Sequence, residues 1–348
     1  LGRYVEKLPA TATADIQLPD MAIGFYPWAL ILDKQLKQLW YVDYHGAAEA
    51  GWLKLHARLQ HALAQSAAFS LSGSWQANMD KAGYVARFNQ VQDYLLSGDC
   101  YQINLTQRFS AAYHGDEWQA YLQLRDKNAA PFSAFIRLPQ GAVLSISPER
   151  FLQLHSNKVE TKPIKGTRPR GICPLTDEVE ADNLRNSAKD RAENVMIVDL
   201  LRNDLGKVCL PGSVAVPQLF AIESFPAVHH LVSTVTGTLA PEYSACDLLR
   251  GAFPGGSITG APKVRAMQII EQLEPQRRSV YCGAIGYINS NSDMDTNIAI
   301  RTLICSEGQI HCQAGGGIVA DSEANSEYQE TLDKLSKILP EINNCKII

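Results

Sequence analysis

The chain has 348 residues, 46% of them hydrophobic and 20% charged, which is the composition of an ordinary globular protein with enough apolar side chains for a large core. Its net charge of -4, with lysines and arginines spread along the sequence, provides no basic patch for nucleic acid. No apolar run approaches the roughly 20 residues that cross a bilayer, and residues 1–10 lack a secretory signal, so we expect a cytoplasmic protein with no membrane association.

The first predicted elements are a hairpin, a helix and a strand. Between Met21 and His45 the runs AIGFYPWALILD and KQLWYVDY flank a polar turn and predict a β-hairpin. Residues 84–95 repeat apolar side chains at helical spacing, which predicts an amphipathic helix that Gly98 ends. Residues 101–105 then alternate apolar and polar side chains, as a strand does.

The later part of the chain contains further strand pairs and three helical blocks. PFSAFIRL pairs with AVLSISPERFLQLH, and the segments near Tyr287 and over 298–304 lead to QIHCQA. Helices are predicted at about 178–205, 262–273 and 323–339. Strands joined by hairpins, with helices in separate blocks, predict an α+β fold with antiparallel sheets.

The chain has no obvious linker and no cysteine motif. Because no Pro/Ser/Gly-rich or charge-rich segment divides it, we expect a single domain over residues 1–348 built of two intimately packed halves. Eight cysteines lie far apart without a CxxC pair, which argues against a zinc site and against a disulfide framework. We expect most of them to be buried, reduced thiols.

Two acidic pairs lie on predicted helices. Asp190 and Glu193 are three residues apart, and so are Glu327 and Glu330, so each pair occupies one helical face. A cation between the two helices would offset the repulsion, and Mg²⁺ suits carboxylates with water and substrate oxygens. Such pairs are also common on solvated helix faces, and Lys334 can pair with Glu330, so the spacing alone leaves both interpretations open.

Lys165 follows a β-like run and precedes Gly166, a residue without Cβ that lets a ligand approach the backbone. A lysine is ordinarily protonated at neutral pH, so a nucleophilic role needs desolvation or a nearby cation. The alternative is a surface lysine in a basic turn with Lys162, Arg168 and Arg170.

An anion site is predicted from Arg301 and the run Gly315, Gly316 and Gly317. Successive backbone N–H groups in a glycine run can cradle a carboxylate, and an arginine can bind one bidentately. A flexible glycine turn and a salt bridge at the rim are the alternatives.

The segment FPGGSITGAPK has glycines at the Walker spacing, yet Ala261 and Pro262 stand where Lys and Ser/Thr are required. This excludes a phosphate loop, and we interpret the segment as substrate-pocket backbone or as a packing turn. Glu149, after a proline, and His230 are the remaining candidates for proton transfer. An exposed glutamate and a hydrogen-bonded core histidine are the alternatives.

The strings PIKGT, KDRAENVMIVDLLRND, HHLVS, GSITGAPKVRAM, GAIGY, IRT and AGGGIVADS together resemble the chorismate-binding enzymes, in this order and across the C-terminal three quarters of the chain. The resemblance implies two sheet layers with flanking helices and a central cleft that binds chorismate and Mg²⁺. It implies a catalytic core of about residues 80–340. Members have a longer N-terminal segment, part of which we expect this chain to lack.

The resemblance also implies the site residues. It puts Glu193 and Glu330 on Mg²⁺, with Asp190 and Glu327 supporting the ion through water. It puts the chorismate carboxylate against Arg301 and the backbone of Gly315, Gly316 and Gly317, near Ser257 and Tyr281. It puts His230 beside the departing hydroxyl.

Two positions indicate the reaction. Anthranilate synthases usually carry Ala where this chain has Lys165, whereas the aminodeoxychorismate synthases of the family carry PIKGT. Isochorismate and salicylate synthases place a water-activating Lys where this chain has Gln102. The implied reaction is amination of chorismate at C4 in the route to p-aminobenzoate and folate, in which Lys165 attacks C2, Mg²⁺ and His230 assist loss of the C4 hydroxyl, and Glu149 is the general acid or base.

No cysteine lies in the Gly-Cys-Gly turn of class I amidotransferases, so we expect ammonia to come from a separate glutamine amidotransferase subunit. Two alternatives stay open. One is an anthranilate synthase large subunit, which aminates C2 and eliminates pyruvate. The other is a non-catalytic relative that binds an amino acid.

Overall fold

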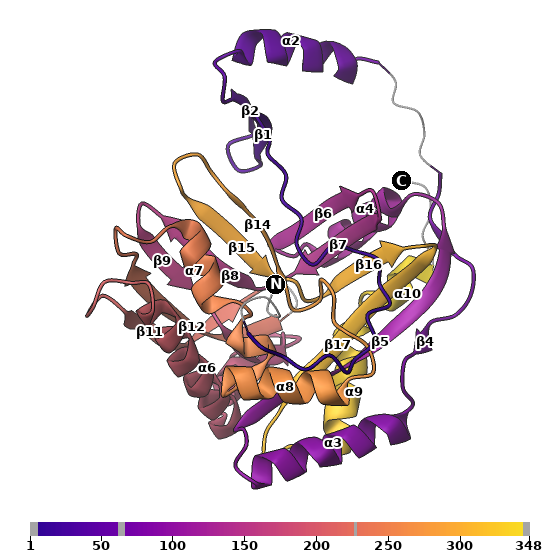
Figure 1. The fold of residues 1–348 in the computed structure, drawn as a ribbon, viewed down its shortest axis with the longest axis vertical. Helices are drawn as coiled ribbons and strands as arrows, with labels where there is room; N and C mark the ends of the chain where they lie inside the picture. The colour runs from indigo at the N-terminus through magenta and orange to yellow at the C-terminus, as the bar shows by residue number, and fades with distance from the viewer. Residues whose placement is uncertain (1–5, 62–66, 226–227, 344–348) are drawn as a thin grey trace. The chain divides into compact units, whose positions relative to one another are not determined.

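The computed structural model describes residues 6–61, 67–225 and 228–343 (Figure 1). It separates the chain into two compact units, one of residues 1–18 with 68–348 and one of residues 19–67. The sequence predicts one domain over residues 1–348, and the predicted catalytic core of about 80–340 lies within the larger unit.

The smaller unit confirms the predicted hairpin. Strand β1 (Trp28–Asp33) pairs antiparallel with β2 (Gln38–Asp43), and helix α2 (Ala48–Leu59) follows. Trp28 stacks on Tyr41 with ring centroids 5.5 Å apart. Among the described residues of this unit no side chain is buried.

In the larger unit, one sheet of eight strands has the order β13-β5-β17-β16-β7-β6, and β3 and β4 both pair with β5. Every pairing in it is antiparallel. The strands are β3 (Ser70–Leu71), β4 (Gln76–Ala77), β5 (Gln102–His114), β6 (Phe132–Leu138), β7 (Gly141–Ser147), β13 (Gly260–Ala261), β16 (Thr302–Ser306) and β17 (Gln309–Ile318).

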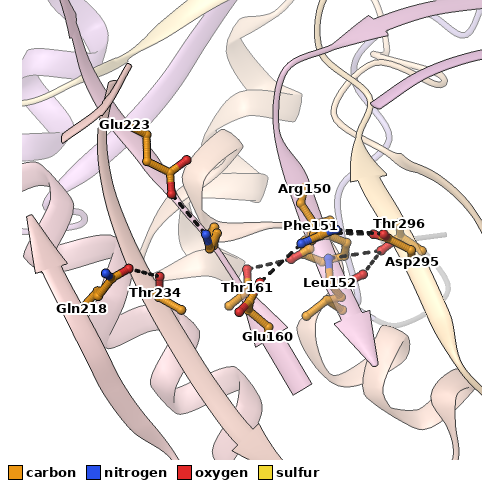
Figure 2. Close-up of polar contacts among 11 residues, drawn as sticks. Arg150, Phe151, Leu152, Glu160, Thr161, Gln218, Glu223, Thr234, Asp295 and Thr296 are labelled. Atoms are coloured by element: carbon orange, nitrogen blue, oxygen red, sulfur yellow. Dashed lines mark hydrogen bonds and ion pairs between the residues drawn. The ribbon is translucent and has the colours of Figure 1, made fainter. Parts of the chain in front are cut away.

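The second sheet has seven strands in the order β10-β12-β9-β8-β15-β14, and β11 also pairs with β12. The strands are β8 (Arg150–His155), β9 (Lys158–Thr161), β10 (Ile164–Pro169), β11 (Ala215–Ser224), β12 (Val228–Thr238), β14 (Ala284–Ile288) and β15 (Met294–Ile298). Side-chain hydrogen bonds and ion pairs connect neighbouring strands. Figure 2 shows Arg150 bound to Asp295 and to Glu160, and the Thr161 hydroxyl donating to the Phe151 carbonyl.

Helices flank both sheets. They are α3 (Lys81–Leu96), α4 (Glu117–Asn128), α5 (Pro174–Arg185), α6 (Ala188–Gly206), α7 (Ala245–Ala252), the 3₁₀ turn η1 (Gly256–Ile258), α8 (Lys263–Leu273), α9 (Ala324–Leu335) and α10 (Leu339–Asn343). Helix α6 packs on β12, α8 on β5 and α9 on β17. The α+β class with antiparallel sheets is therefore confirmed.

Two predicted helices are shorter than expected. The helix predicted over 178–205 is two helices, α5 and α6, because the Ser187 hydroxyl accepts from the Asp190 amide at 3.3 Å and caps a new helix. The helix predicted over 323–339 ends at Leu335, and α10 begins at Leu339. Polar residues hide the first boundary in the apolar pattern, whereas at the second the apolar stripe continues through Leu335 and Leu339 although the helix does not.

One predicted strand also divides. AVLSISPERFLQLH forms β7 in the eight-stranded sheet and β8 in the seven-stranded sheet, with Pro148 and Glu149 between them. The chain crosses back between β15 and β16, where Arg301 adopts a φ of +51°. The two crossings lie side by side, since the Ser147 hydroxyl donates to the Ile298 carbonyl at 2.6 Å.

The core and the cysteines agree with a reduced globular protein. Leu152, Ile197 and Leu248 are fully buried between the seven-stranded sheet and helices α6 and α7. Seven cysteines in the described residues are free and five of them are buried, as predicted, whereas Cys345 lies outside those residues. Of the helices so described, none has the length and apolar character that a membrane span requires.

Candidate active site

The two crossings between the sheets bring Glu149 and Arg301 into one region. The amide of Ile298 donates to the Glu149 carbonyl at 3.1 Å, and the amide of Ile146 donates to the Arg301 carbonyl at 3.0 Å. A positive φ at a non-glycine residue such as Arg301 costs about 1 kcal/mol.

The carboxyl group of Glu149 is buried, with 6% of the residue exposed. Its Oε1 accepts from the Ser257 hydroxyl at 3.3 Å. Burial raises the pKa of Glu149 to about 7, although the positive charge of Lys165 acts in the opposite direction. A carboxyl group with this pKa can give or take a proton near neutral pH.

Lys165 lies in β10 at an irregularity of its pairing with β12, between Ile164 and Thr167. Gly166 has a φ of +82°, and a methyl group there would meet Asp190 Cγ at 2.8 Å, so glycine is required both for backbone conformation and for space. The Lys165 ammonium donates to the Ser257 carbonyl at 3.1 Å. Ser257 therefore contacts both Lys165 and Glu149.

His230 lies on β12 directly across from Thr167 of β10, and its Nδ1 is 2.9 Å from the Thr167 hydroxyl. Burial, and to a smaller extent the charge of Arg301, lower the pKa of His230 to about 4. The imidazole is therefore neutral near pH 7 and can take part in hydrogen bonds, but it is not a cation.

The guanidinium of Arg301 has no hydrogen-bond acceptor and no carboxylate partner within the described residues. Burial lowers its pKa, and the nearby Tyr281 and Cys312 oppose that effect. Tyr281 is buried, which raises the pKa of its phenol. A half-buried guanidinium without a counter-ion is a binding position for an anionic ligand.

The glycine run does not form the loop expected from the sequence. Gly315, Gly316 and Gly317 lie within β17 and pair with Thr106, Leu105 and Asn104 of β5. Successive N–H groups of an extended strand point in opposite directions, so this run is not a cradle of adjacent donors. Strand β16 reaches only to Cys312 of β17, so along the glycines no strand of the described residues pairs with the opposite edge.

The lack of side chains on this run allows polar groups to approach closely. A methyl group on Gly317 would lie 2.1 Å from Gln102 Nε2 and 3.1 Å from Glu193 Oε1. A methyl group on Gly316 would lie 2.9 Å from Glu327 Oε2 and 3.5 Å from Glu330 Oε1. Carboxylates of α6 and α9 therefore approach adjacent residues of one strand.

The four predicted carboxylates have different partners. Glu330 is bound by Lys334 at 2.6 Å, Asp190 by Arg168 at 3.1 Å, and Glu327 accepts from Ser322 at 2.7 Å. Lys189 of α6 lies 3.8 Å from Glu327 of α9, so the two helices face one another. Glu193 has no ion-pair or hydrogen-bond partner among the described residues.

Electrostatics links the two halves of the region. Burial would raise the pKa of Glu330, yet the charges of Lys334, Lys189 and Lys165 bring it below its usual range. Burial and the charge of Glu330 raise the pKa of Glu327. Because Lys165 and Lys334 each act on Glu149 as well as on Glu330, these four groups share one charged neighbourhood.

The donor set fits a hard divalent cation. No three His, Cys, Asp or Glu side chains gather closely enough to hold a metal by themselves in the part of the chain that the structure describes. Mg²⁺ needs no such cage, because it commonly takes one or two carboxylates and completes its octahedron with water and substrate oxygens. Glu193, which has no partner among the described residues, and Glu330, once released from Lys334, would provide such carboxylates.

Three contacts were not predicted as parts of the site. Thr167 orients His230, Lys189 reaches Glu327, and Lys334 occupies both Glu330 and the Gly315 carbonyl at 2.8 Å. Lys334 was visible in the sequence only as a helical partner of Glu330. Gln102 is fully buried, and neither polar atom of its amide has a hydrogen-bond partner in the described residues, although it lies over Gly317.

Comparison with known proteins supports an enzymatic site. The profile of the chorismate binding enzymes matches residues 1–340. Aminodeoxychorismate synthase component 1 of Klebsiella aerogenes is 57% identical over 345 residues, covering 99% of this chain and 75% of the relative. The protein of the same name in Escherichia coli K12 is 57% identical over 343 residues, covering 98% of this chain and 75% of the relative.

A solved structure supports the fold. Anthranilate synthase component I from Streptococcus pneumoniae TIGR4 superposes with a TM-score of 0.85 and 31% identity, covering 97% of this chain and 77% of that one. The similarity covers nearly the whole chain in fold and in sequence. The chain belongs to the family of chorismate-binding enzymes.

Proposed function

We propose that this chain catalyses the Mg²⁺-dependent amination of chorismate at C4, giving 4-amino-4-deoxychorismate in the route to p-aminobenzoate and folate. The observation that carries the proposal is Lys165, which shares Ser257 with the buried Glu149 and lies in one charged neighbourhood with Glu330. The relatives at 57% identity are named aminodeoxychorismate synthase component 1, which supports the same reaction.

Chorismate is a dianion with two carboxylates, and the chain offers a matching cation. The unpaired guanidinium of Arg301 would bind one carboxylate bidentately, with the buried Tyr281 beside it. Of the run Gly315, Gly316 and Gly317, only the N–H groups that point away from β5 would be able to donate to the same carboxylate. This arrangement would orient the ring relative to Lys165.

In the first half of the reaction, the Lys165 amine bonds to C2, the ring double bonds shift, and the C4–O bond breaks. The hydroxyl leaves as water after taking the proton of Glu149, whose pKa of about 7 suits a general acid. His230 would hold the departing oxygen by a hydrogen bond as a neutral imidazole. The Lys165 nitrogen stays in the adduct as a secondary ammonium.

In the second half, ammonia bonds to C4 while the C2–N bond breaks and Lys165 leaves as a neutral amine. The new C4 ammonium gives one proton to the Glu149 carboxylate, which restores the acid. The balance is chorismate plus ammonia giving 4-amino-4-deoxychorismate plus water. The side chain of Gln102 is an amide and cannot act as a base, so Gln102 does not assist attack by water.

Glu193 and Glu330 would hold the metal, with Asp190 and Glu327 supporting it through water. When bound, Mg²⁺ supplies positive charge that offsets the substrate carboxylate and the developing charge on the leaving group. For Glu330 to take this role, Lys334 has to give up its contact with the carboxylate.

Glu330→Gln is therefore expected to weaken Mg²⁺ binding at least about ten-fold, because one of two protein carboxylates is lost. Titration calorimetry of the chain with MgCl₂ measures the change without turnover. Asp333→Asn, an exposed carboxylate on the same helix α9, is the matched control and should bind as the unaltered chain does. Equal Mg²⁺ affinity in Glu330→Gln and the unaltered chain would remove Glu330 from the metal site.

We further propose a separate glutamine amidotransferase subunit as the source of ammonia, and a cytosolic location, which the free thiols support. With chorismate and Mg²⁺, the chain alone should form product from ammonium chloride and none from glutamine. Product from glutamine in a preparation free of other proteins would contradict the need for a partner.

The test of the proposed function is the identity of the product. Chorismate, Mg²⁺ and ammonium incubated with the chain should yield a non-fluorescent product that keeps the enolpyruvyl side chain, as seen by mass spectrometry. Fluorescent anthranilate together with pyruvate would indicate amination at C2 instead. No consumption of chorismate would indicate a non-catalytic relative.

A further inference from the structure

Strand β10, which carries Lys165, is an edge strand whose pairing partner is β12. Three cations on or beside it pair with acids of three other elements. Lys162 binds Glu223 of β11 at 3.1 Å, as the dashed line at Glu223 in Figure 2 shows. Arg168 binds Asp190 of α6 at 3.1 Å, and Arg170 binds Asp177 of α5 at 2.6 Å. Lys165, the fourth cation of this segment, differs from the other three because it donates to a backbone carbonyl and not to a carboxylate.

Asp177 is the centre of the largest of these contacts. Its Oδ1 accepts from Arg170 Nε at 2.7 Å, from the Gly171 amide at 2.8 Å and from His229 Nε2 at 2.9 Å, and its Oδ2 accepts from Arg170. These contacts, led by the hydrogen bond from Arg170, hold the pKa of Asp177 far below its usual range. Asp177 is therefore ionised at any pH at which the enzyme works.

His229 carries the contact to the next strand. The residue is 2% exposed, and its Nδ1 lies 2.8 Å from the hydroxyl of Ser224 on β11. Arg170 also donates to the carbonyl of Phe225 at 3.0 Å. We call Arg170, Asp177, Ser224 and His229 the Asp177 cluster, and it joins the end of β10 to α5, β11 and β12.

Along the paired strands β10 and β12, the Asp177 cluster lies beside Thr167 and His230. Arg168 is the cross-strand partner of His229, and Thr167 is the partner of His230, so His229 of the cluster directly precedes the histidine of the Thr167–His230 contact. Between Ile164 and Thr167 the pairing is irregular, so neither Lys165 nor Gly166 is held by a regular ladder. Beyond the Arg168–Asp190 ion pair, the cluster holds the C-terminal end of β10 to α5, β11 and β12.

We propose that Asp177 is a positioning residue for Lys165 and His230, acting through the hydrogen bonds that fasten the end of β10 to β12. The inference rests on the proposed role of Lys165. A displacement of reacting groups by about 1 Å can cost up to 100-fold in rate, whereas ligand binding held by groups elsewhere is little affected. Arg301 lies between β15 and β16, outside the cluster, so substrate binding should persist.

Ser224, His229 and Asp177 are also linked by hydrogen bonds in the sequence hydroxyl, imidazole, carboxylate of a catalytic triad, but they do not form an activated nucleophile. Arg170 neutralises Asp177 and takes two of its hydrogen-bond positions, so the carboxylate adds little basicity to His229. The contacts instead link the end of β10 to α5, β11 and β12, as a structural role in positioning β10 requires.

The test compares Asp177→Asn with Asp182→Asn, which removes an exposed carboxylate on the same helix that pairs with Arg185. An asparagine has one acceptor oxygen for four donors. With ammonium as amine source, Asp177→Asn should lower kcat about ten-fold and leave the KM for chorismate within about two-fold. Amide hydrogen exchange over residues 164–170 should become faster, and Asp182→Asn should change neither quantity.

Arg170→Gln provides a second variant on the exposed side of the cluster and should give the same pattern. An unchanged kcat in folded Asp177→Asn and Arg170→Gln would overturn the proposal, and so would a lower melting temperature with normal kcat, since that indicates a purely structural role. If the unaltered chain does not aminate chorismate, the proposed function fails separately. The hydrogen-exchange measurement then tests the positioning role of Asp177 without turnover. Unchanged amide exchange in both variants would contradict that role, and faster exchange only over residues 164–170 would support it.

Discussion

Lys165→Met is expected to lower the rate of chorismate amination by at least about a thousand-fold, because covalent capture at C2 is lost and no other amine replaces it. The binding of chorismate should persist, since Arg301 and the open edge of β17 are untouched. Turnover with saturating ammonium is followed by mass spectrometry of the product. Calorimetry with chorismate then separates the loss of chemistry from a loss of binding.

Two further variants distinguish the nucleophile from its charge. Lys165→Arg keeps a cation near Glu149 and Glu330 but cannot form the adduct, so it should be as inactive as Lys165→Met. Lys158→Met, which removes a lysine that binds Thr238 on β12, should retain full activity. If Lys165→Met or Lys165→Arg kept more than about a tenth of the rate, Lys165 would not be the nucleophile.

Glu149→Gln is expected to have opposite effects on activity and on stability. Loss of a general acid should lower kcat by about 100-fold or more. The folded pKa of Glu149 is raised from 4.5 to about 7, so the folded state resists ionisation that the unfolded state undergoes freely. The contribution of Glu149 to stability is therefore fully present below about pH 4.5 and is lost as the pH rises through about 7.

Glutamine cannot ionise, so Glu149→Gln should be more stable than the unaltered chain by up to about 3 kcal/mol near pH 8 and by nothing near pH 4.5. Urea unfolding at the two pH values measures the difference. Glu178→Gln, an exposed glutamate of α5, should show no such pH dependence. A gain of equal size at both pH values would show that burial does not raise the pKa of Glu149.

The elements with clear periodicity were predictable from the sequence. The hairpin before residue 45 and helix α3 were found because their apolar residues alternate or repeat every three to four positions. The break at Ser187 was missed because its cap lies in a polar run, where apolar periodicity carries no signal. The division of β7 from β8 was missed because one continuous apolar run serves two sheets.

The candidate site was only partly predictable for a related reason. Lys165, Glu149 and His230 could be named from their motifs, but their common neighbourhood depends on two crossings between sheets that local patterns do not encode. The glycines were expected to cradle an anion in a loop. They lie in a strand instead, where their missing side chains admit Glu193, Glu327 and Glu330. The contact of Lys334 with Glu330 could be suggested from their helical spacing. The second partner of Lys334, the Gly315 carbonyl, became known only from the structure.

Covalent capture by Lys165 is tested most directly by mass spectrometry of the protein quenched after mixing with chorismate and Mg²⁺ in the absence of ammonium. We expect a protein species heavier by chorismate less one water, mapped by peptide analysis to the segment that contains Lys165. Addition of ammonium should remove the adduct and release 4-amino-4-deoxychorismate. The absence of any adduct on Lys165 without ammonium, in a preparation that forms product steadily once ammonium is added, would contradict covalent capture.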